Sequence, residues 1–340
     1  MSLRHWLERG LNQLWYHNSP WSWPLLPVSL LYCSTAVVRR RLYVSGLLRS
    51  DRLPVPVVVV GNLSVGGTGK TPLVIWLADF LRQQTDYRIG LLSSGYRSEQ
   101  AEESVMVRAD SDPLIVGDEA VLLAQKTALP VCAGRNRLAA GRRLLQQGCN
   151  LILCDDGLQH YRLQRDIEIA VVDAQREVGN GHCLPAGPLR EPRSRLASID
   201  LTIYHSTTPD SRLSIRSSCR RAWSLANHRL VKSLADFRGQ TVYAVAGIAH
   251  PGNFFNSLRE AGLTVLERPF PDHHRYRSED LFFAGEKPVL MTEKDAVKCR
   301  LFSPANSWAV PLETEVASDV EAAVLGLLTN MPTKRLFKHG

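Results

Sequence analysis

The sequence lacks the cysteine patterns and the repeats that identify disulfide-rich, zinc-binding and repeat proteins. Its seven cysteines are odd in number and scattered, and they form no C-x-x-C pair or Cys/His zinc spacing. This argues against a disulfide framework and a structural zinc site, and favours a reducing compartment. The sequence also has no internal repeat or low-complexity tract. The 44% apolar content of its 340 residues predicts a buried core in one large or two medium domains.

Acidic residues are scarce near the N-terminus. In the first 52 residues, seven arginines are accompanied only by Glu8 and Asp51, and the whole chain carries a net charge of +8. A basic segment beside apolar residues favours an anionic membrane surface over nucleic acid, so we expect no nucleic-acid partner. The alternative is a solvated, charged face of the protein.

The N-terminal segment contains a charge-free run of eighteen residues, 21–38, followed at once by three arginines. Before it, Leu3, Leu7, Leu11 and Trp15 recur every four residues, as on one face of an amphipathic helix. The run approaches the ~20 residues that span a bilayer, but Pro24 and Pro27 interrupt it. We therefore predict a helix within one leaflet, with a full span or a buried helix of the main domain as alternatives.

The same segment does not resemble a cleaved signal peptide, because no small-residue cleavage site follows the apolar run. The three arginines after it would face the cytoplasm by the positive-inside tendency.

From residue 55 onward, short β-branched runs alternate with amphipathic stretches, which predicts an α/β fold with a doubly wound, mainly parallel sheet. The expected strands are 55–60, 89–92, 151–154, 167–172, 201–204, 242–246 and 289–291; the expected helices include 72–81, 118–126 and 138–147. Residues 205–240 are rich in serine and arginine and weakly periodic. We therefore predict an N-terminal membrane-associated segment (1–50), a larger domain (51–236) and a smaller C-terminal α/β domain (237–340).

A glycine-rich loop follows the first expected strand. It reads Gly66-Gly67-Thr68-Gly69-Lys70-Thr71 and precedes Pro72, a residue suited to a first helical turn. In phosphate loops the backbone amides surround the phosphates, the lysine reaches the β and γ oxygens, and the hydroxyl takes Mg²⁺. The strict spacing would place glycine at Ser64, so the form is atypical. A glycine-rich turn without nucleotide is the alternative; we predict binding of ATP with Mg²⁺ and a P-loop NTPase type of fold.

The expected strand 151–154 ends in Asp155 and Asp156. Carboxylates at such a strand end hold Mg²⁺ in nucleotide-binding proteins, although the same pattern occurs where a strand simply enters a solvated turn. Together with the glycine-rich loop, it predicts that Asp155, Asp156 and Thr71 hold the metal.

Four more polar clusters lie in loop-like settings, where function concentrates. Asp118 follows Gly117 at an expected helix start, where it could equally be a helix cap. Arg135 and Arg137 follow the flexible Gly134 and suit phosphate or carboxylate binding, or a plain surface loop. The Pro/Gly-rich stretch 179–192, which contains Arg190 and Glu191, is either an active-site loop or a connection.

The fourth cluster is Asp272-His273-His274. An Asp-His pair can act in proton transfer, although a lone histidine is more often structural.

Taken together, these stretches resemble the tetraacyldisaccharide 4′-kinase family. The matching stretches run in the same order through nearly the whole chain: 61–72, 93–98, 116–124, 134–137, 154–173, 179–192, 270–276 and 291–298. The most specific are DDGLQHYRLQRDIEI and LPAGPLREP.

The resemblance implies a two-domain enzyme on the cytoplasmic face of the bacterial inner membrane. Its expected reaction is transfer of the ATP γ-phosphate to the 4′-hydroxyl of the membrane lipid tetraacyldisaccharide 1-phosphate, giving lipid IVA in lipid A biosynthesis. The chain is expected to act as a monomer at that membrane surface.

The resemblance also assigns roles to residues. It implies that Asp118 is the base and His273 its partner from the second domain, with ATP closing the two domains. Lys70 and Thr71 keep their nucleotide and Mg²⁺ roles, and Asp155 and Asp156 lie beside the metal. Arg190 and Glu191 match active-site loop positions, and Arg135 and Arg137 remain candidates for substrate binding.

Two positions depart from the family pattern. Ser94 stands where arginine is common, and His274 offers a second candidate partner for Asp118. His273 is preferred because it directly follows Asp272.

Two rival functions remain from the sequence. One is a membrane-recruited ATPase switch, which would need no Asp-His pair. The other is a GTPase, since Thr292-Glu293-Lys294-Asp295 faintly resembles the guanine motif [NT]-K-x-D with the wrong spacing.

Overall fold

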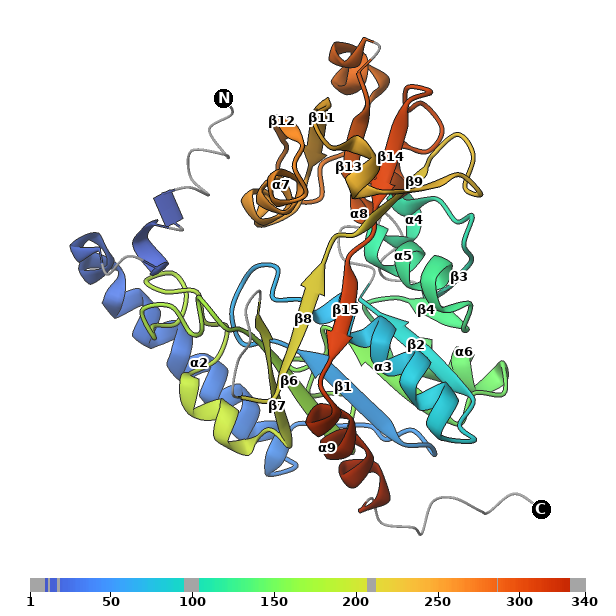
Figure 1. The fold of residues 1–340 in the computed structure, drawn as a ribbon. Coiled ribbons are helices and arrows are strands. Elements are labelled where there is room, and N and C mark those ends of the chain that lie inside the picture. Colours follow the sequence, from blue (N-terminus) through green and yellow to red (C-terminus); the bar gives the residue numbers. More distant parts are fainter. Residues whose placement is uncertain are drawn as a thin grey trace.

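A computed structural model describes residues 10–11, 13–16, 19–94, 104–206, 212–285 and 287–330. Within these ranges the strands form a nine-stranded and a six-stranded sheet, with helices packed on both (Figure 1). Two stretches used above, 1–9 and 95–98, lie outside the described residues.

The large sheet has the order β15-β8-β7-β6-β1-β5-β2-β4-β3 and is parallel except for β3 and β15. Its strands are β1 Val57–Gly61, β2 Ile89–Ser93, β3 Val105–Val107, β4 Val131–Ala133, β5 Leu151–Asp155, β6 Ile167–Asp173, β7 Leu201–Ser206, β8 Ser214–Ser218 and β15 Glu313–Val316. Its helices are α3 Lys70–Gln84, α4 Pro113–Val116, α5 Asp118–Thr127, α6 Arg137–Gln146, α9 Ser318–Thr329 and the 3₁₀ helix η2 Arg193–Ser198.

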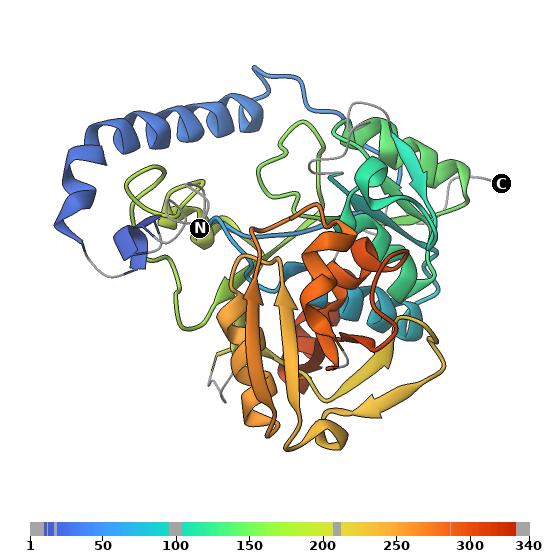
Figure 2. The ribbon, with the colours of Figure 1, turned by 90° about the horizontal axis from the view of Figure 1, so that it is seen from above.

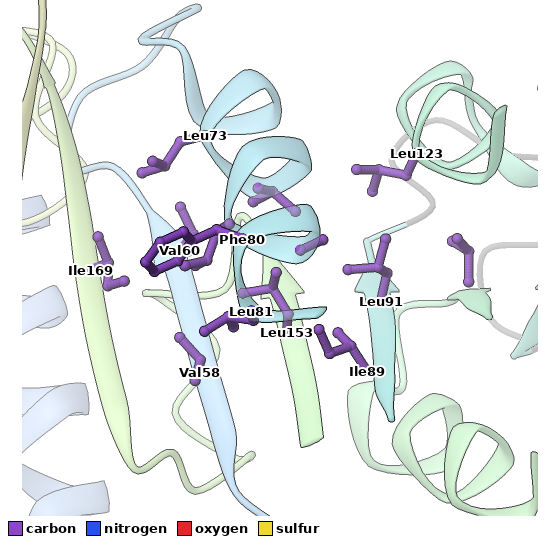
Figure 3. Packing of buried hydrophobic residues seen from close by; sticks show 14 of the residues in the cluster. Val58, Val60, Leu73, Phe80, Leu81, Ile89, Leu91, Leu123, Leu153 and Ile169 are labelled. Atoms are coloured by element: carbon purple, nitrogen blue, oxygen red, sulfur yellow. The ribbon is translucent and has the colours of Figure 1, made fainter. Parts of the chain in front are cut away.

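The valine run that predicted a buried strand forms β1, whose five residues are all buried between β5 and β6. Its side chains alternate between two cores. On one face Val58 and Val60 pack with α3, α5 and α9, and on the other Val57 and Val59 pack with α6 (Figure 3 shows the first core). Helices therefore cover both faces of a mainly parallel sheet, which confirms the doubly wound prediction.

The small sheet has the order β10-β9-β14-β13-β11-β12. Its strands are β9 Arg221–Ser224, β10 Val231–Ser233, β11 Thr241–Ala246, β12 Thr264–Pro269, β13 Val289–Thr292 and β14 Ser307–Val310. The accompanying helices are α7 Pro251–Glu260, α8 Glu293–Cys299 and the 3₁₀ helices η3 Leu234–Phe237 and η4 Ser278–Ala284. Two further cores lie on its faces, one containing Phe254 and Phe255 from α7, the other Ala296 and Cys299 from α8.

The chain crosses between the two sheets more than once. Strands β9 and β10 precede residue 237 but belong to the small sheet, while β15 and α9 follow it and return to the large sheet and its core (Figure 1). The expected division at residues 50 and 236 remains a prediction. Helix α8 packs against α5 of the large sheet, so the two halves meet at that pair of helices.

The N-terminal segment forms the 3₁₀ helix η1 (Pro20–Leu25), which contains Pro24, and then α2 (Leu26–Val44). Figure 2 shows α2 running along the periphery of the molecule. Among the described residues this is the one helical segment, 25 residues in all, that is long and apolar enough to cross a membrane. Because most of it is exposed, the alternative of a buried helix of the main domain does not hold.

Candidate active site

The glycine-rich loop joins β1 to α3, and its glycines are needed at two positions. Gly66 and Gly69 have φ of 112° and 88°, in the region that favours glycine. A Cβ on Gly69 would also lie 2.7 Å from the imidazole of His205. The loop thus ends at the N-terminus of a fifteen-residue helix, which begins at Lys70, so its amides and the helix dipole face the same point.

Lys70 and Arg190 meet at the carboxylate of Asp156. Its Oδ1 lies 3.7 Å from Lys70 Nζ and 3.1 Å from Arg190 Nη1. Burial raises the pKa of Asp156, but the two cations lower it by a larger amount. The pKa of Asp156 therefore lies below its ordinary value. Two cations converging beside a phosphate loop suit a group with several negative charges.

The stretch 188–190 reaches this point because it runs alongside the glycine-rich loop. The Val65 amide donates to the carbonyl of Pro188 over 2.8 Å, and the Arg190 amide donates to the carbonyl of Leu63 over 2.6 Å. The Pro/Gly-rich segment is therefore part of the site's wall, which favours the active-site alternative over a plain connection.

Thr71 and Asp155 lie together at the ends of α3 and β5. The Thr71 hydroxyl donates to Asp155 Oδ2 over 3.3 Å, and Asp155 is 2% exposed. Burial, and then the nearby Glu119, raise the pKa of Asp155 to about 7. Its other oxygen, Oδ1, has no hydrogen-bond partner among the described residues.

These features fit Mg²⁺. A buried carboxylate with an unused oxygen beside a hydroxyl offers hard oxygen ligands. Across the described part of the chain, no group of three or more His, Cys, Asp or Glu side chains is arranged for a metal. Mg²⁺ is usually held by one or two carboxylates together with substrate phosphates, so such a sparse donor set suits it.

Asp118 and His273 form a pair that joins the two halves of the chain. Asp118 is the first residue of α5, and it is 6% exposed. His273 Nδ1 lies 3.0 and 3.1 Å from the two carboxylate oxygens of Asp118. Burial raises the pKa of Asp118, but the hydrogen bond from His273 and the charges of Lys294 and Lys298 outweigh it and hold the pKa below its ordinary value.

The neighbouring histidine, His274, pairs with a different carboxylate. His274 Nε2 lies 3.0 Å from Asp280 Oδ2, and its ring stacks on Phe270 with 4.7 Å between the ring centroids. Of the two histidines, the structure thus brings His273 to Asp118. The backbone of His273 has φ of 58°, a left-handed turn conformation that is uncommon for residues other than glycine.

Arg137, one of the two arginines predicted to bind substrate, is buried. It is 3% exposed, and its guanidinium donates to the carbonyls of Leu92 and Asp156 over 3.2 and 3.1 Å. These contacts of Arg137 tie the ends of β2 and β5 together, which favours a structural role; a substrate contact by Arg137 stays a prediction. Arg135, by contrast, is exposed.

This difference predicts unequal effects on stability. Replacing Arg137 by methionine removes the guanidinium that donates to the carbonyls of Leu92 and Asp156, and is expected to lower the free energy of unfolding by about 2 kcal/mol. Arg135→Met, the matched control, should change it by less than about 0.5 kcal/mol. Urea denaturation of both variants measures the difference; equal effects would contradict the structural role of Arg137.

Glu191 also points inward. It is 4% exposed, accepts a 2.7 Å hydrogen bond from the Tyr161 hydroxyl, and lies 3.4 Å from Arg195 Nε. Burial raises its pKa, while Tyr161 and Arg195 oppose that shift. In this arrangement Glu191 anchors the segment that carries Arg190, and a direct substrate contact remains only a sequence-based expectation.

Sequence reasoning gave no role to two lysines that face the Asp118–His273 pair. Lys294 and Lys298 lie one turn apart on α8, and Lys298 Nζ is 3.6 Å from Asp118 Oδ2. Their signal in the sequence is the stretch 291–298, which matches the family but assigns no role to either lysine; within it, residues 292–295 faintly resemble the guanine motif. That idea does not fit the structure, because Asp295 is fully buried and accepts hydrogen bonds from Thr292 and the Gly247 amide.

Comparison with known proteins identifies the family of the chain. The model of the tetraacyldisaccharide-1-P 4′-kinase family matches residues 21–329. The chain belongs to this family. It is 49% identical to the tetraacyldisaccharide 4′-kinase of Nitrosococcus oceani over 95% of each chain, and 47% identical to that of Stenotrophomonas maltophilia over 89% of this chain and 91% of that one.

A solved structure shows the same fold. LpxK from Aquifex aeolicus, determined in complex with ATP, is 28% identical, with a TM-score of 0.73 over 90% of this chain and 99% of that one. The family relationship and this likeness confirm the predicted family, the P-loop kinase fold and the use of ATP.

Proposed function

We propose that this member of the tetraacyldisaccharide 4′-kinase family transfers the γ-phosphate of ATP to the 4′-hydroxyl of a tetraacyldisaccharide 1-phosphate, giving lipid IVA. The observation that carries the proposal is the Asp118–His273 pair, 3.0 Å apart and joined across the two sheets. An ATPase switch needs only the phosphate loop, whereas transfer to a sugar hydroxyl needs a positioned group that accepts the hydroxyl proton.

Each proposed role follows from the contacts above. The amides of 66–69 and Lys70 would bind the triphosphate, and Arg190 would stabilise negative charge on the γ-phosphoryl group. Thr71 and Asp155 would hold Mg²⁺, with Asp156 beside them; the bound cation neutralises phosphate charge. Asp118 would accept the hydroxyl proton while His273 holds its carboxylate in place. Phosphoryl transfer requires mainly positioning and charge neutralisation, which these residues supply.

The direct test is an incubation with ATP, Mg²⁺, detergent and tetraacyldisaccharide 1-phosphate. We expect a lipid bis-phosphate, and we expect unlabelled ATP to suppress its labelling while GTP at the same concentration does not. ATP hydrolysis without a phosphorylated lipid would instead favour the ATPase switch.

The lipid acceptor suggests how the enzyme meets its substrate. Helix α2 attaches to the main body through polar contacts: the Ser29 hydroxyl donates to the Cys183 carbonyl over 2.6 Å, and Arg40 donates to Ser198 over 3.0 Å. Its apolar side chains face outward, with Leu30 and Leu31 66% and 67% exposed. Exposed apolar patches of this kind mark interaction surfaces.

Two tryptophans extend this apolar surface on η1, where Trp21 and Trp23 are 78% and 74% exposed. Tryptophans near arginines are typical of the membrane interface. We infer that 20–44 rests on the cytoplasmic face of the bacterial inner membrane and that the enzyme acts there as a monomer.

This surface predicts the effect of polar substitutions. The double variant Leu30→Gln/Leu31→Gln is expected to weaken partitioning onto anionic phospholipid vesicles by at least about tenfold, because each leucine loses on the order of 1.5–3 kcal/mol of burial. Leu301→Gln, which changes a leucine that is 96% exposed on the other half of the molecule, is the matched control. Vesicle flotation measures both; unchanged binding of the double variant would refute the anchor.

A further inference from the structure

Helix α8 brings two largely buried ammonium groups to the Asp118–His273 pair. Lys294 and Lys298 have side chains 18% and 7% exposed, so both charges are largely removed from water. Buried lysines are rare unless they are paired, and here each lies within 4 Å of carboxylates. Their position on the helix that packs against α5 directs them to the start of α5.

Lys294 binds three groups around the pair. Its Nζ lies 3.1 Å from Glu119 Oε1, 3.5 Å from Asp272 Oδ1 and 3.3 Å from His273 Nε2. Burial lowers the pKa of Lys294, but Glu119, Asp118 and Asp272 outweigh this and raise it above its ordinary value, so the amine stays charged. An ammonium group has three N–H donors and no acceptor.

The contacts of Lys294 therefore determine where His273 carries its proton. The ammonium group can only donate, so Nε2 accepts from it. The Asp272 carboxylate also faces Nε2, but its Oδ2 lies 3.8 Å away, beyond hydrogen-bond distance, so the ring proton is placed on Nδ1. Nδ1 is the nitrogen that faces the Asp118 carboxylate, at 3.0 Å from Oδ2. The opposite tautomer would place an N–H against the ammonium group and a lone pair against the carboxylate.

We propose that Lys294 is a positioning residue that selects the Nδ1–H tautomer of His273, so that the imidazole donates to Asp118 and aims its carboxylate at the sugar hydroxyl. Lys298, 3.6 Å from Asp118 Oδ2 and 3.0 Å from Asp295 Oδ1, fixes the same carboxylate from the next turn of α8. The expected effect of Lys294 on catalysis rests on the proposed function, whereas the tautomer of His273 does not depend on it.

The kinetic test compares Lys294→Met with Lys294→Arg. Methionine keeps the length of the side chain and removes the donor; we expect kcat for lipid phosphorylation to fall roughly tenfold, less than the ~10²–10⁴-fold effect of a general base, with KM for ATP unchanged. Arginine, which retains a charged donor, should recover much of the loss. Equal kcat for Lys294→Met and the wild type would overturn the proposal.

A matched control separates positioning from helix packing. Lys126 forms a 2.5 Å ion pair with Glu293 across the same contact between α5 and α8, away from Asp118. Lys126→Met should leave kcat near the wild-type value. If it lowers kcat as much as Lys294→Met does, Lys294 serves only to hold the helices together and the proposal is wrong.

A spectroscopic measurement tests the tautomer without any lipid. In the full-length protein labelled with ¹⁵N-histidine, the wild type at pH 7.5 should show His273 with a protonated Nδ1 and an unprotonated Nε2, and Lys294→Met should lose this pattern. An Nε2–H tautomer in the wild type, or the same ¹⁵N shifts in both proteins, would contradict the inference. A wild type that makes no lipid bis-phosphate would refute the proposed function while leaving this measurement valid.

Discussion

Replacing Asp118 by asparagine is expected to reduce lipid phosphorylation by about 10²–10⁴-fold, the usual contribution of a positioned general base. Asparagine keeps the shape of the side chain and its hydrogen-bonding capacity but cannot accept the proton of the sugar hydroxyl. Because the side-chain partners of Asp118 among the described residues are His273 and Lys298, in the other half of the chain from the glycine-rich loop, affinity for Mg–ATP should stay at the wild-type level. Isothermal titration with ATP and a lipid phosphorylation assay measure the two quantities separately.

Helix η4 offers a control of matching chemistry for Asp118. Asp280 forms a second Asp-His pair, with His274 at 3.0 Å, but it lies outside the proposed site. Asp280→Asn should keep nearly full activity. Normal turnover by Asp118→Asn would exclude Asp118 as the base, and equal losses in the two variants would point to damage to the fold.

The electrostatics of Asp118 bear on how activity depends on pH. Its pKa is held below the ordinary value for aspartate by His273, Lys294 and Lys298, despite opposing burial. The carboxylate therefore stays ionised at neutral and mildly acidic pH and is protonated only below the usual aspartate range of about 4. A loss of activity between pH 8 and pH 5 would have to arise from another group.

The second large effect is expected at the phosphate loop. Lys70→Met should lower kcat/KM for ATP by about 10²–10³-fold, because one charged donor to the transferring phosphoryl group is removed. Lys70 Nζ lies 3.7 Å from Asp156 Oδ1. In the variant Asp156 loses this ion pair and keeps the one with Arg190. Steady-state kinetics with varied ATP measure the loss.

The control for Lys70→Met is a lysine outside the proposed site. Lys126→Met removes a lysine from the end of α5 that is far along the helix from Asp118, and it should leave kcat/KM for ATP unchanged. If Lys70→Met retained wild-type kcat/KM, the glycine-rich loop would not be the nucleotide site.

The local parts of the site could be predicted from sequence because each depends on neighbouring residues. A run of valines, then glycines, then Gly69-Lys70-Thr71 gives a buried strand, a phosphate loop and a helix start, and the structure has β1 and α3 at those places. Asp155 was identified in the same way, since β5 is apolar up to that residue.

The parts that depend on contacts between distant residues could not be derived from periodicity. Arg137 occurs in a motif that reads as a polar loop, yet it is buried because the ends of β2 and β5 supply carbonyl acceptors. The choice between His273 and His274 depends on a φ of 58° and on the position of Asp280, neither of which a sequence pattern contains.

The weakly periodic stretch 205–240 shows a further reason why some elements could not be predicted from the sequence. It contains β8, β9 and β10, in which polar residues alternate with only a few buried ones. These strands lie toward the edges of the two sheets, so few of their side chains need to be apolar and the hydrophobic pattern is weak. Likewise, Lys294 meets Asp118 and His273 only because α8 packs on α5.

The central claim is that the γ-phosphate is passed to a sugar hydroxyl by the Asp118–His273 pair and not to water. The most direct measurement is the ratio of ADP formed to lipid bis-phosphate formed, with ³¹P NMR identifying the new phosphate monoester. The account predicts one ADP for each bis-phosphate lipid in the wild type, with the new phosphate at the 4′ position. ADP formed in excess at an unchanged rate without the lipid, or a phosphate attached elsewhere, would contradict it.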